Sequence, residues 1–295
     1  MPDDPRESVS DSGSVVRAAP AKLNVFLRVL GAREDGYHDV ESLVLPLSLA
    51  DTVTVRASNT LRVRVRGDDS LTEAVEEGGM NLALVAALAL GGACTGSGAD
   101  IVIDKRIPVA AGLGGGSADA AAVLLALQRV WECGLDTEAL LEIAARIGSD
   151  VPAMLLGDPV LLRGRGERLE PVAAAPTWWA VVPFAFPTRS PDAYRWWDEA
   201  GHRTGPDTSA AVDALRDSDV GELGGLLHND LEDVVIERHP EIGRTKRALL
   251  DAGALGSVMS GSGPTVVALA RSELHATELA AGFPGALAVS APWAP

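Results

Sequence analysis

The segment PVAAGLGGGSAD, residues 108–119, is the part of the sequence whose residue types most directly indicate chemistry. Four of the five residues from Gly112 to Gly116 are glycines, which lack a Cβ atom and let the backbone approach a ligand closely. A helix is predicted to begin directly after them at Ser117, and the first turn of a helix carries unpaired N–H groups at the positive end of its dipole. A loop of this kind that leads into a helix N-terminus predicts a phosphate-binding site.

Two better-known phosphate loops do not fit this segment. The Walker A motif requires a Lys after its glycines, and none follows here. The dinucleotide fingerprint G-x-G-x-x-G fits at Gly112 and Gly114, but Ser117 stands where its third glycine belongs. Glycines at this density also occur in mobile hinges and at close packing contacts. That alternative stays open, although the setting between a strand and a helix favours phosphate.

Lys22 and Asp150 are the charged candidates for such a site, because phosphate transfer needs a countercharge and a group that accepts a proton. Lys22 opens a segment of nearly alternating apolar residues, where a Lys is also typical of a solvated strand edge. Asp150 follows a predicted helix end among apolar neighbours, where it could equally be a turn or capping residue. Asn24 lies on the same face of the predicted strand as Lys22. The residues alone leave these alternatives open.

The elements that must position these side chains alternate between strand and helix periodicity in an α+β order. The segments 51–57 and 61–66 alternate strictly and predict antiparallel strands with one wet face. Asn81 is placed to cap a short helix. The predicted strands are 15–30, 43–49, 51–57, 61–66, 100–106, 160–163, 178–184, 255–259 and 265–270, and the predicted helices are 82–90, 117–133, 137–148, 209–227 and 240–252.

Composition excludes several classes of protein. The chain has 295 residues with 25 Lys+Arg against 41 Asp+Glu, and a formal charge of −16 disfavours nucleic acid as a partner. Its apolar runs are too short for a membrane, and its N-terminus is not a signal peptide.

Cys94 and Cys133 are predicted to be two buried thiols of a cytoplasmic protein. We expect a disordered acidic tail over 1–15 and two domains, 16–158 and 159–295.

The glycine-rich segment, extended as PVAAGLGGGSADAAAVL, resembles the phosphate loop of the GHMP small-molecule kinases, which include galactokinase, homoserine kinase and mevalonate kinase. PAKLNVFLRVLGAREDGYHDVES near the N-terminus and GSVMSGSGPTVVAL near the C-terminus resemble the other motifs of the family, in the same order. The resemblance implies a two-domain α+β fold. It has an N-terminal half like ribosomal protein S5, a mixed α/β C-terminal half, and an active-site cleft between them.

The DGYH element, together with KRIP, IGSDVP and HNDLE, is similar to the members of this family that phosphorylate a cytidine-diphosphate polyol. This implies that ATP, with Mg2+, phosphorylates the 2-hydroxyl of a small-molecule acceptor in non-mevalonate isoprenoid synthesis. We expect a monomer or weak homodimer. A kinase of the homoserine or mevalonate type and a catalytically silent nucleotide-binding member are the alternatives.

The resemblance also implies roles for individual residues. Lys22 and Asp150 become the catalytic pair, and no metal ligand is assigned, although Ser117 could touch Mg2+ by motif position. The SGSGP loop supports the phosphate loop, and HNDLE receives no chemical role. Acceptor contacts are implied for Asn24, Tyr37, His38, Ser190 and Tyr194, with the two tyrosines stacked on cytosine. ATP contacts are implied for Asn81, Lys105, Pro108, Val109, Ala110, Ala111, Gly112, Leu113, Gly114, Gly115, Gly116, Ser117 and Ala118.

Overall fold

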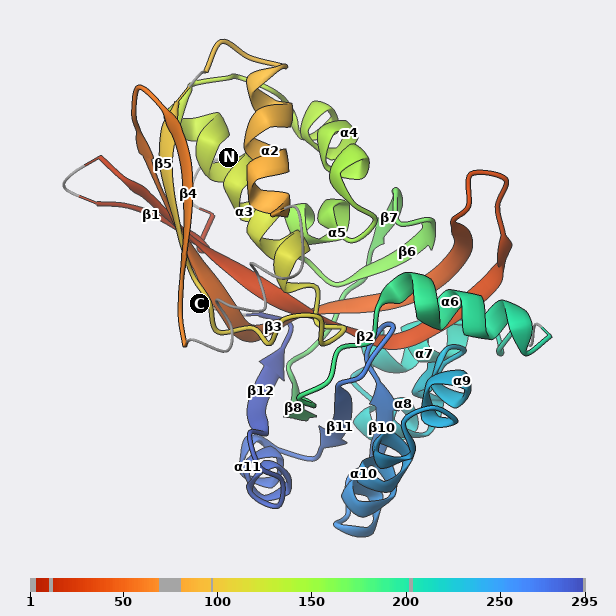
Figure 1. Ribbon diagram of the computed structural model, residues 1–295. Coiled ribbons are helices and arrows are strands. Elements are labelled where there is room, and N and C mark those ends of the chain that lie inside the picture. The colour runs from red at the N-terminus through yellow and green to blue at the C-terminus, as the bar shows by residue number, and fades with distance from the viewer. Residues whose placement is uncertain (1–3, 11–12, 69–80, 97, 202–203, 294–295) are drawn as a thin grey trace.

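Two β-sheets organise the protein (Figure 1). The computed structural model describes the chain except residues 1–3, 11–12, 69–80, 97, 202–203 and 294–295. The larger sheet follows the path β1 (Glu7–Val9), β2 (Val15–Ala32), β3 (His38–Ala57), β5 (Ala99–Asp104) and β4 (Leu61–Arg66), with β6 (Val160–Gly164), β7 (Arg168–Pro171) and β9 (His228–Asn229) added at its sides. The smaller sheet has the order β10 (Gly256–Met259), β11 (Val266–Ala270), β8 (Thr177–Val182) and β12 (Leu287–Ala291).

The β2–β3 hairpin is the backbone of the larger sheet. Its strands pair antiparallel along most of their length, with register shifts on β2 between Pro20 and Lys22 and between Asn24 and Phe26. Such irregularities re-aim neighbouring side chains. The predicted strand over 15–30 is confirmed, whereas the segments predicted separately at 43–49 and 51–57 form the single strand β3.

Helices α2–α5 cover one face of the larger sheet (Figure 1). The middle of α3 is rich in Ala, which lets this helix pack closely on the strands and on α2. Asn81 caps α2 as predicted, since its Oδ1 accepts a hydrogen bond from the N–H of Ala83. Asp136 caps α4 in the same way. The four helices are α2 (Leu82–Gly91), α3 (Gly115–Val130), α4 (Thr137–Ile147) and α5 (Val151–Leu156).

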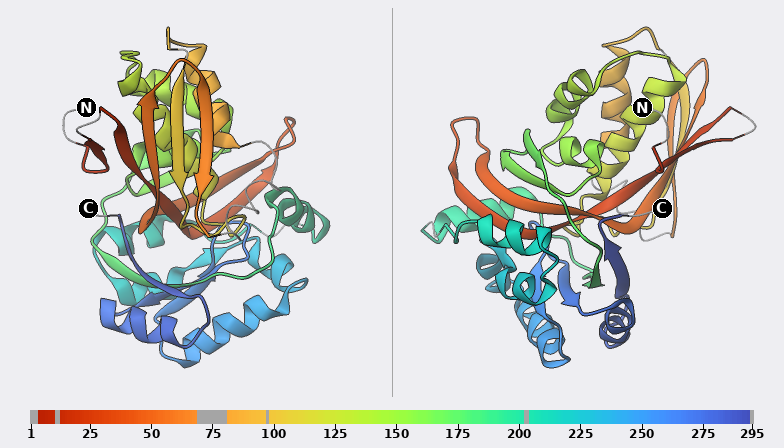
Figure 2. Two further views of the ribbon diagram at one scale, coloured as in Figure 1. Left: turned by 60° about the vertical axis from the view of Figure 1, so that its left-hand side comes forward. Right: turned by 180° about the vertical axis from the view of Figure 1, so that it is seen from behind.

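The smaller sheet and its helices form the lower half of the molecule in the two views of Figure 2. Its strands β8 and β11 are almost wholly apolar and buried. The predicted boundary between residues 158 and 159 stays a prediction. It falls between α5 and β6, and β6 still pairs with β3. The helices are α6 (Ser190–Glu199), α7 (Ser209–Arg216), α8 (Val220–Leu226), α9 (Glu232–Ile236), α10 (Pro240–Asp251) and α11 (Glu273–Ala281).

Strands β3 and β4 run antiparallel to each other as predicted, but β5 lies between them and pairs parallel with β4. Two other predictions about secondary structure are wrong. The helix predicted over 209–227 is two helices, separated near Ser218, whose φ of 61° is incompatible with a continuous helix. The tail predicted over 1–15 contains β1, which pairs with β2 while Arg17 forms ion pairs with Asp4 and Glu7.

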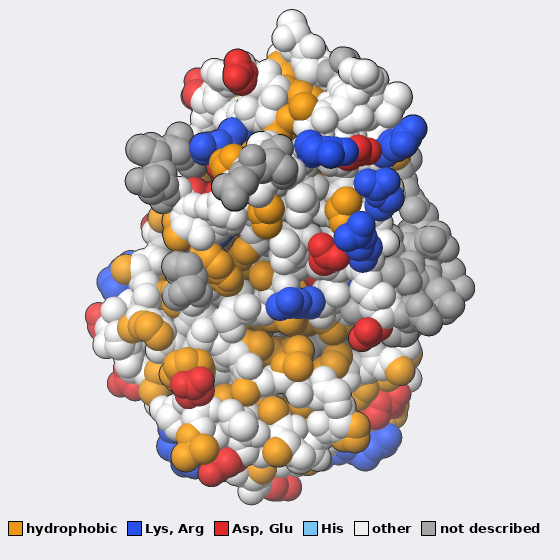
Figure 3. Space-filling model, turned by 90° about the vertical axis from the view of Figure 1, so that its left-hand side faces the viewer, with side chains coloured by type: hydrophobic (Ala, Val, Ile, Leu, Met, Phe, Trp, Pro, Cys, Tyr) orange, Lys and Arg blue, Asp and Glu red, His pale blue; other side chains and the backbone are white. Residues whose placement is uncertain are grey.

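Strand β4 closes the path of the larger sheet with alternating arginines. Arg62, Arg64 and Arg66 are exposed, while Leu61 and Val63 pack against the core. Lys and Arg side chains gather in the upper half of the side of the molecule shown in Figure 3. Charged side chains on an outer strand oppose pairing with another chain, so we interpret this row as protection of the sheet. Within the described residues, no helix is long and apolar enough to cross a membrane.

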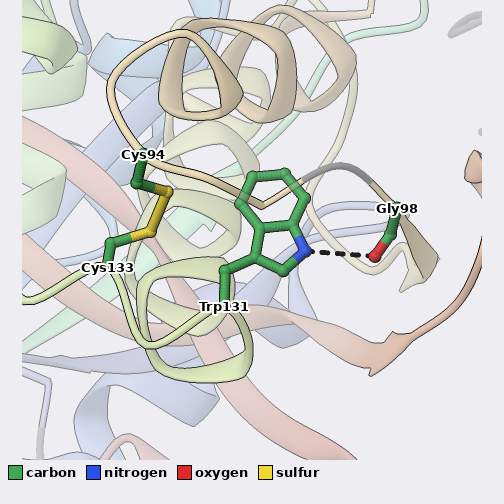
Figure 4. Close-up of a disulfide and its surroundings, with 4 residues drawn as sticks. All are labelled: Cys94, Gly98, Trp131 and Cys133. Carbon is green, nitrogen blue, oxygen red and sulfur yellow. Dashed lines mark hydrogen bonds between the residues drawn. A yellow bond between two sulfur atoms is a disulfide. The ribbon is translucent and has the colours of Figure 1, made fainter.

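Cys94 and Cys133 form a disulfide, so the prediction of two separate buried thiols is wrong (Figure 4). Both are only partly buried. The bond joins the chain after α2 to the chain after α3. Beside it, the indole N–H of Trp131 donates a hydrogen bond of 3.0 Å to the carbonyl of Gly98. The far ends of two helices that begin near the glycine-rich segment are therefore tied together.

Candidate active site

A cavity of about 840 Å³ brings together the residues selected from the sequence. It is lined by the glycine-rich segment, by parts of β2 and β3, by the start of α6, and by the loop between β10 and β11. Of the predicted site residues, all line it except Leu113 and Ala118, which are buried. The cavity therefore joins segments from both halves of the chain.

The glycine-rich segment has the geometry of an anion site. Gly114 is the N-cap of α3 and adopts φ 70°, in the left-handed region. Because Gly114 has no side chain to cap the helix, the N–H groups of the first turn stay available to a ligand. Gly112 also has a positive φ, and a Cβ there would lie 2.2 Å from the carbonyl oxygen of Ser260. The glycine at 112 is therefore required by the close approach of the C-terminal loop.

Lys22 and Asp150 meet beside this segment. Their closest atoms, Nζ and Oδ2, are 3.8 Å apart, and the exposed fractions of the side chains are 6% and 39%. Lys22 is thus not the solvated strand-edge charge that the sequence left open. Its backbone N–H donates to the carbonyl of Leu113. Asp150 is the N-cap residue of α5, but its carboxylate makes no capping hydrogen bond within the described chain, and the residue lines the cavity.

Asn24 fixes the position of the Lys22 ammonium. Its Oδ1 accepts a hydrogen bond from Nζ of Lys22, and its Nδ2 donates to Oγ of Ser42 at 2.8 Å. The Ser42 hydroxyl in turn donates to the carbonyl of Phe26 at 2.6 Å. All three side chains are buried. A buried network in which each polar group has a partner holds one arrangement, so the ammonium has a defined direction.

The aromatic candidates also line the cavity. The ring of His38 stacks on that of Tyr194, with centroids 4.7 Å apart, and its Nε2 lies 2.9 Å from Oδ1 of Asp198. Burial and the charge of Asp150 raise the pKa of Tyr194. Tyr37 is 49% exposed and has the guanidinium of Arg165 over its ring at 4.4 Å. One face of each tyrosine ring is therefore covered by a protein group.

Lys105 follows the end of β5 and is buried beside the glycine-rich segment. Its ammonium bonds to the carboxylates of Asp51 and Asp119. Burial opposes its charged form, but these two carboxylates outweigh burial and raise the pKa of Lys105. Burial raises the pKa of Asp119 to about 7, with the charge of Asp51 adding to the effect and the attraction of Lys105 opposing it. A Cβ on Gly115 would lie 3.3 Å from Nζ of Lys105, so this ion cluster supports the start of α3.

Sequence reasoning missed several residues that line the cavity, among them Asp119, Arg165 and Asp198. Asp119 stood inside the quoted motif, but nothing in the sequence pairs it with Lys105 and Asp51. Arg165 follows β6 and reaches Tyr37 only through the pairing of β6 with β3. Asp198 lies near the end of α6, an unpredicted helix, and contacts His38 across the cavity. Such contacts are set by tertiary structure and leave no local signal.

The side chains that line the cavity can be compared with those that a metal ion requires. Within the described part of the chain, no group of three His, Cys, Asp or Glu side chains could hold a metal ion. Mg2+ bound to a nucleotide takes most of its ligands from phosphate and water and needs only one or two protein oxygens. The hydroxyl of Ser117, in the first turn of α3 at the cavity, suits that role.

Comparison with known protein families gives two matches along the chain. The GHMP kinases N terminal domain matches residues 81–158, and the GHMP kinases C terminal domain matches residues 211–288. The first match contains the glycine-rich segment and Asp150, and the second contains the loop between β10 and β11.

Individual proteins are similar over most of the chain. A 4-diphosphocytidyl-2-C-methyl-D-erythritol kinase of Symbiobacterium thermophilum is 44% identical, covering 84% of this chain and 87% of its own. The enzyme of that name from Pelotomaculum thermopropionicum is 40% identical over 91% and 93% of the two chains. A crystal structure of 4-(cytidine 5'-diphospho)-2C-methyl-D-erythritol kinase superposes with a TM-score of 0.77 at 35% identity, covering 95% of this chain and 100% of the other. Leishmania major mevalonate kinase, at 16% identity and a TM-score of 0.73, shares the fold.

Proposed function

The chain belongs to the GHMP kinases, and from that premise we propose that it transfers the γ-phosphate of ATP to the 2-hydroxyl of 4-diphosphocytidyl-2-C-methyl-D-erythritol. The observation that carries the proposal is the convergence of Lys22 and Asp150 beside the N-terminus of α3. The named relatives support the choice of acceptor.

ATP occupies the end of the cavity formed by the glycine-rich segment. Its phosphates accept hydrogen bonds from the N–H groups of the first turn of α3, where the helix dipole adds attraction. Asn81 and Lys105 lie at the nucleotide end, Lys105 acting through the ion cluster that supports the loop. Ser117 would hold Mg2+ together with oxygens of the nucleotide, and the ion would supply positive charge against the triphosphate.

The transfer needs one proton acceptor and one countercharge. Asp150 accepts the proton of the 2-hydroxyl as the hydroxyl oxygen forms its bond to the γ-phosphorus, and the bond from that phosphorus to the bridging oxygen breaks to release ADP. Lys22, held by Asn24, stabilises the negative charge of the phosphoryl group during transfer.

The cytidine end of the acceptor binds among the aromatic residues. Cytosine stacks on Tyr37 and Tyr194, and His38, oriented by Asp198, contacts its polar edge. Ser190 lies beside this region, with its hydroxyl 2.9 Å from that of Ser262. A small, cytosine-bearing acceptor suits these groups, and the charge of −16 disfavours nucleic acid. We propose a cytoplasmic enzyme that works as a monomer or weak homodimer.

ADP release against four acceptors tests this function. The purified protein is given ATP and Mg2+ with 4-diphosphocytidyl-2-C-methyl-D-erythritol, homoserine, mevalonate or galactose. We expect rapid ADP release with the first acceptor only. Faster release with homoserine or mevalonate would reassign the chain to a sister activity, and no release with any acceptor would favour a silent nucleotide-binding protein.

A further inference from the structure

The segment HNDLE, residues 228–232, has a place in the fold that suggests a role. Its first two residues form β9, which pairs parallel with β2 at Phe26 and Leu27. Strand β2 also carries Lys22 and Asn24. The segment therefore runs alongside the strand that supplies the proposed countercharge.

Asn229 uses its side-chain amide to hold the loop between β10 and β11. Its Nδ2 donates two hydrogen bonds of 2.7 Å, one to the carbonyl of Met259 and one to the carbonyl of Gly261. Its Oδ1 accepts a bond of 2.9 Å from the N–H of Leu231. The residue is 6% exposed. A primary amide has two N–H donors and an acceptor oxygen, so Asn229 is fully engaged on both sides.

The loop that Asn229 holds is hydrogen-bonded to the glycine-rich segment. The hydroxyl of Ser260 donates to the carbonyl of Gly112 at 3.1 Å, and the N–H of Thr265 donates to the carbonyl of Ala111 at 3.3 Å. The backbone at Gly112 therefore packs on the loop between β10 and β11, and Asn229 holds that loop in place.

The same loop lies against the proposed countercharge. A Cβ built on Gly261 would lie 2.7 Å from Nζ of Lys22 and 3.1 Å from Oδ1 of Asn24. Gly261 has φ 57°, in the left-handed region. The space beside Gly261 is therefore taken up by the ammonium, with no room for a side chain, and the carbonyl of Gly261 is one of the two to which Asn229 donates.

We infer that Asn229 is a positioning residue for phosphoryl transfer. By gripping the carbonyls of Met259 and Gly261, it holds the loop in the place that confines the Lys22 ammonium and supports Gly112. This inference rests on the proposed function for its effect on catalysis, but the grip itself is a property of the fold. Glu232 strengthens it, since its Oε2 accepts from the N–H of Met259 at 2.7 Å.

The isosteric change Asn229→Asp tests the inference. Aspartate retains an acceptor for Leu231 but loses both donors and places negative charge against two carbonyl oxygens. We expect kcat to fall about 10–100-fold, as for a small displacement of a reacting group, while KM for each substrate changes by less than about 5-fold. Asn229→Ala serves as a second variant, and Gly261→Ala disturbs the same contact with Asn229 intact, with the same loss expected in kcat.

Ser257→Ala is the matched control. Ser257 is buried on β10, and its hydroxyl donates to the carbonyl of Val267 at 2.9 Å, away from the cavity. Removing the Ser257 hydroxyl also removes a buried hydrogen bond from a side chain to the backbone, as the changes at Asn229 do. We expect this control to lower the melting temperature but to leave kcat within about 2-fold of the parent. Amide hydrogen exchange supplies a readout that needs no turnover: the amides of Gly263 and Thr265 should exchange faster in Asn229→Asp and not in Ser257→Ala.

Loss of kcat in Asn229→Asp beyond that of Ser257→Ala, with faster exchange in the loop, supports the inference. Equal kcat in the two variants, or unchanged exchange at Gly263 and Thr265, overturns it. A parent protein that fails to phosphorylate the cytidine-diphosphate acceptor overturns the proposed function instead. The exchange experiment then still decides whether Asn229 holds the loop.

Discussion

The ammonium nitrogen of Lys22 lies 3.8 Å from Oδ2 of Asp150, although one residue belongs to β2 and the other to the start of α5. The Lys side chain is buried and bonded to Asn24, whereas the Asp side chain is 39% exposed toward the cavity. The cation is therefore fixed and the carboxylate remains accessible. A fixed countercharge beside an accessible base is the arrangement that transfer of a phosphoryl group to an alcohol requires.

Removing the ring of Tyr37 should weaken the acceptor and not ATP. Stacking on a base contributes about 1–3 kcal/mol, so Tyr37→Ala should raise the KM of the cytidine-diphosphate acceptor about 5–150-fold. Tyr37→Phe keeps the ring and is the matched control, with a KM near that of the parent. Steady-state kinetics with each substrate varied in turn gives both constants. A raised KM for ATP with an unchanged KM for the acceptor would reverse the assignment of the two ends of the cavity.

Replacing Lys22 should affect the chemical step. Lys22→Met keeps the length and much of the volume of the side chain but removes the charge that we propose stabilises the transferring group. Loss of one such stabilising group lowers kcat about 10²–10³-fold, and the affinity for ATP in the absence of acceptor should change little. Equilibrium binding of the nucleotide, measured beside kcat, separates the two effects. Loss of nucleotide binding with the residual kcat intact would argue against the role.

The buried carboxylate of Asp119 should make stability depend on pH. In the folded protein burial raises its pKa from 3.8 to about 7. Between these values the folded chain holds a proton that the unfolded chain has lost, so raising the pH through this window lowers the free energy of unfolding. Relative to Asp119→Asn, the parent should lose about 2–3 kcal/mol between about pH 5 and about pH 8.

Urea unfolding of the parent and of Asp119→Asn at a series of pH values measures that difference. Asp213→Asn removes an exposed carboxylate and is the control, because its difference from the parent should stay flat across the series. A flat difference for Asp119→Asn as well would show that this carboxylate is already ionised in the folded protein near pH 5.

The disulfide between Cys94 and Cys133 should stabilise the N-terminal half without taking part in the chemistry. It closes a loop with a sequence separation of 39 residues, and such cross-links typically contribute about 2–4 kcal/mol. Replacing both cysteines with Ser should lower the free energy of unfolding by that order and leave kcat unchanged at room temperature. Urea unfolding under non-reducing conditions checks the first point. Equal stability of parent and double variant would indicate that the thiols are unpaired in solution.

Local chemistry made part of this site predictable. Three of its features each depend on only a few neighbouring residues. They are the glycines at 112 and 114, the cap at Asn81 and the helix that begins at the glycine-rich segment. The ion cluster of Lys105 was not predictable, because Asp51 comes from another strand and burial reverses the usual expectation for a Lys. The parallel pairing of β4 also escaped prediction, since alternation gives the faces of a strand and not the direction of its neighbour. The hydrogen bond from Asn229 to the carbonyl of Gly261 was not predictable either, because it joins residues far apart in the sequence.

The role of Asp150 is tested most directly by a single turnover. Parent enzyme and Asp150→Asn, each in excess over 4-diphosphocytidyl-2-C-methyl-D-erythritol and saturated with ATP and Mg2+, are mixed and quenched at successive times. Loss of the general base should slow formation of the phosphorylated product about 10²–10⁴-fold while both substrates still bind. Product formed by Asp150→Asn at the rate of the parent would contradict the account.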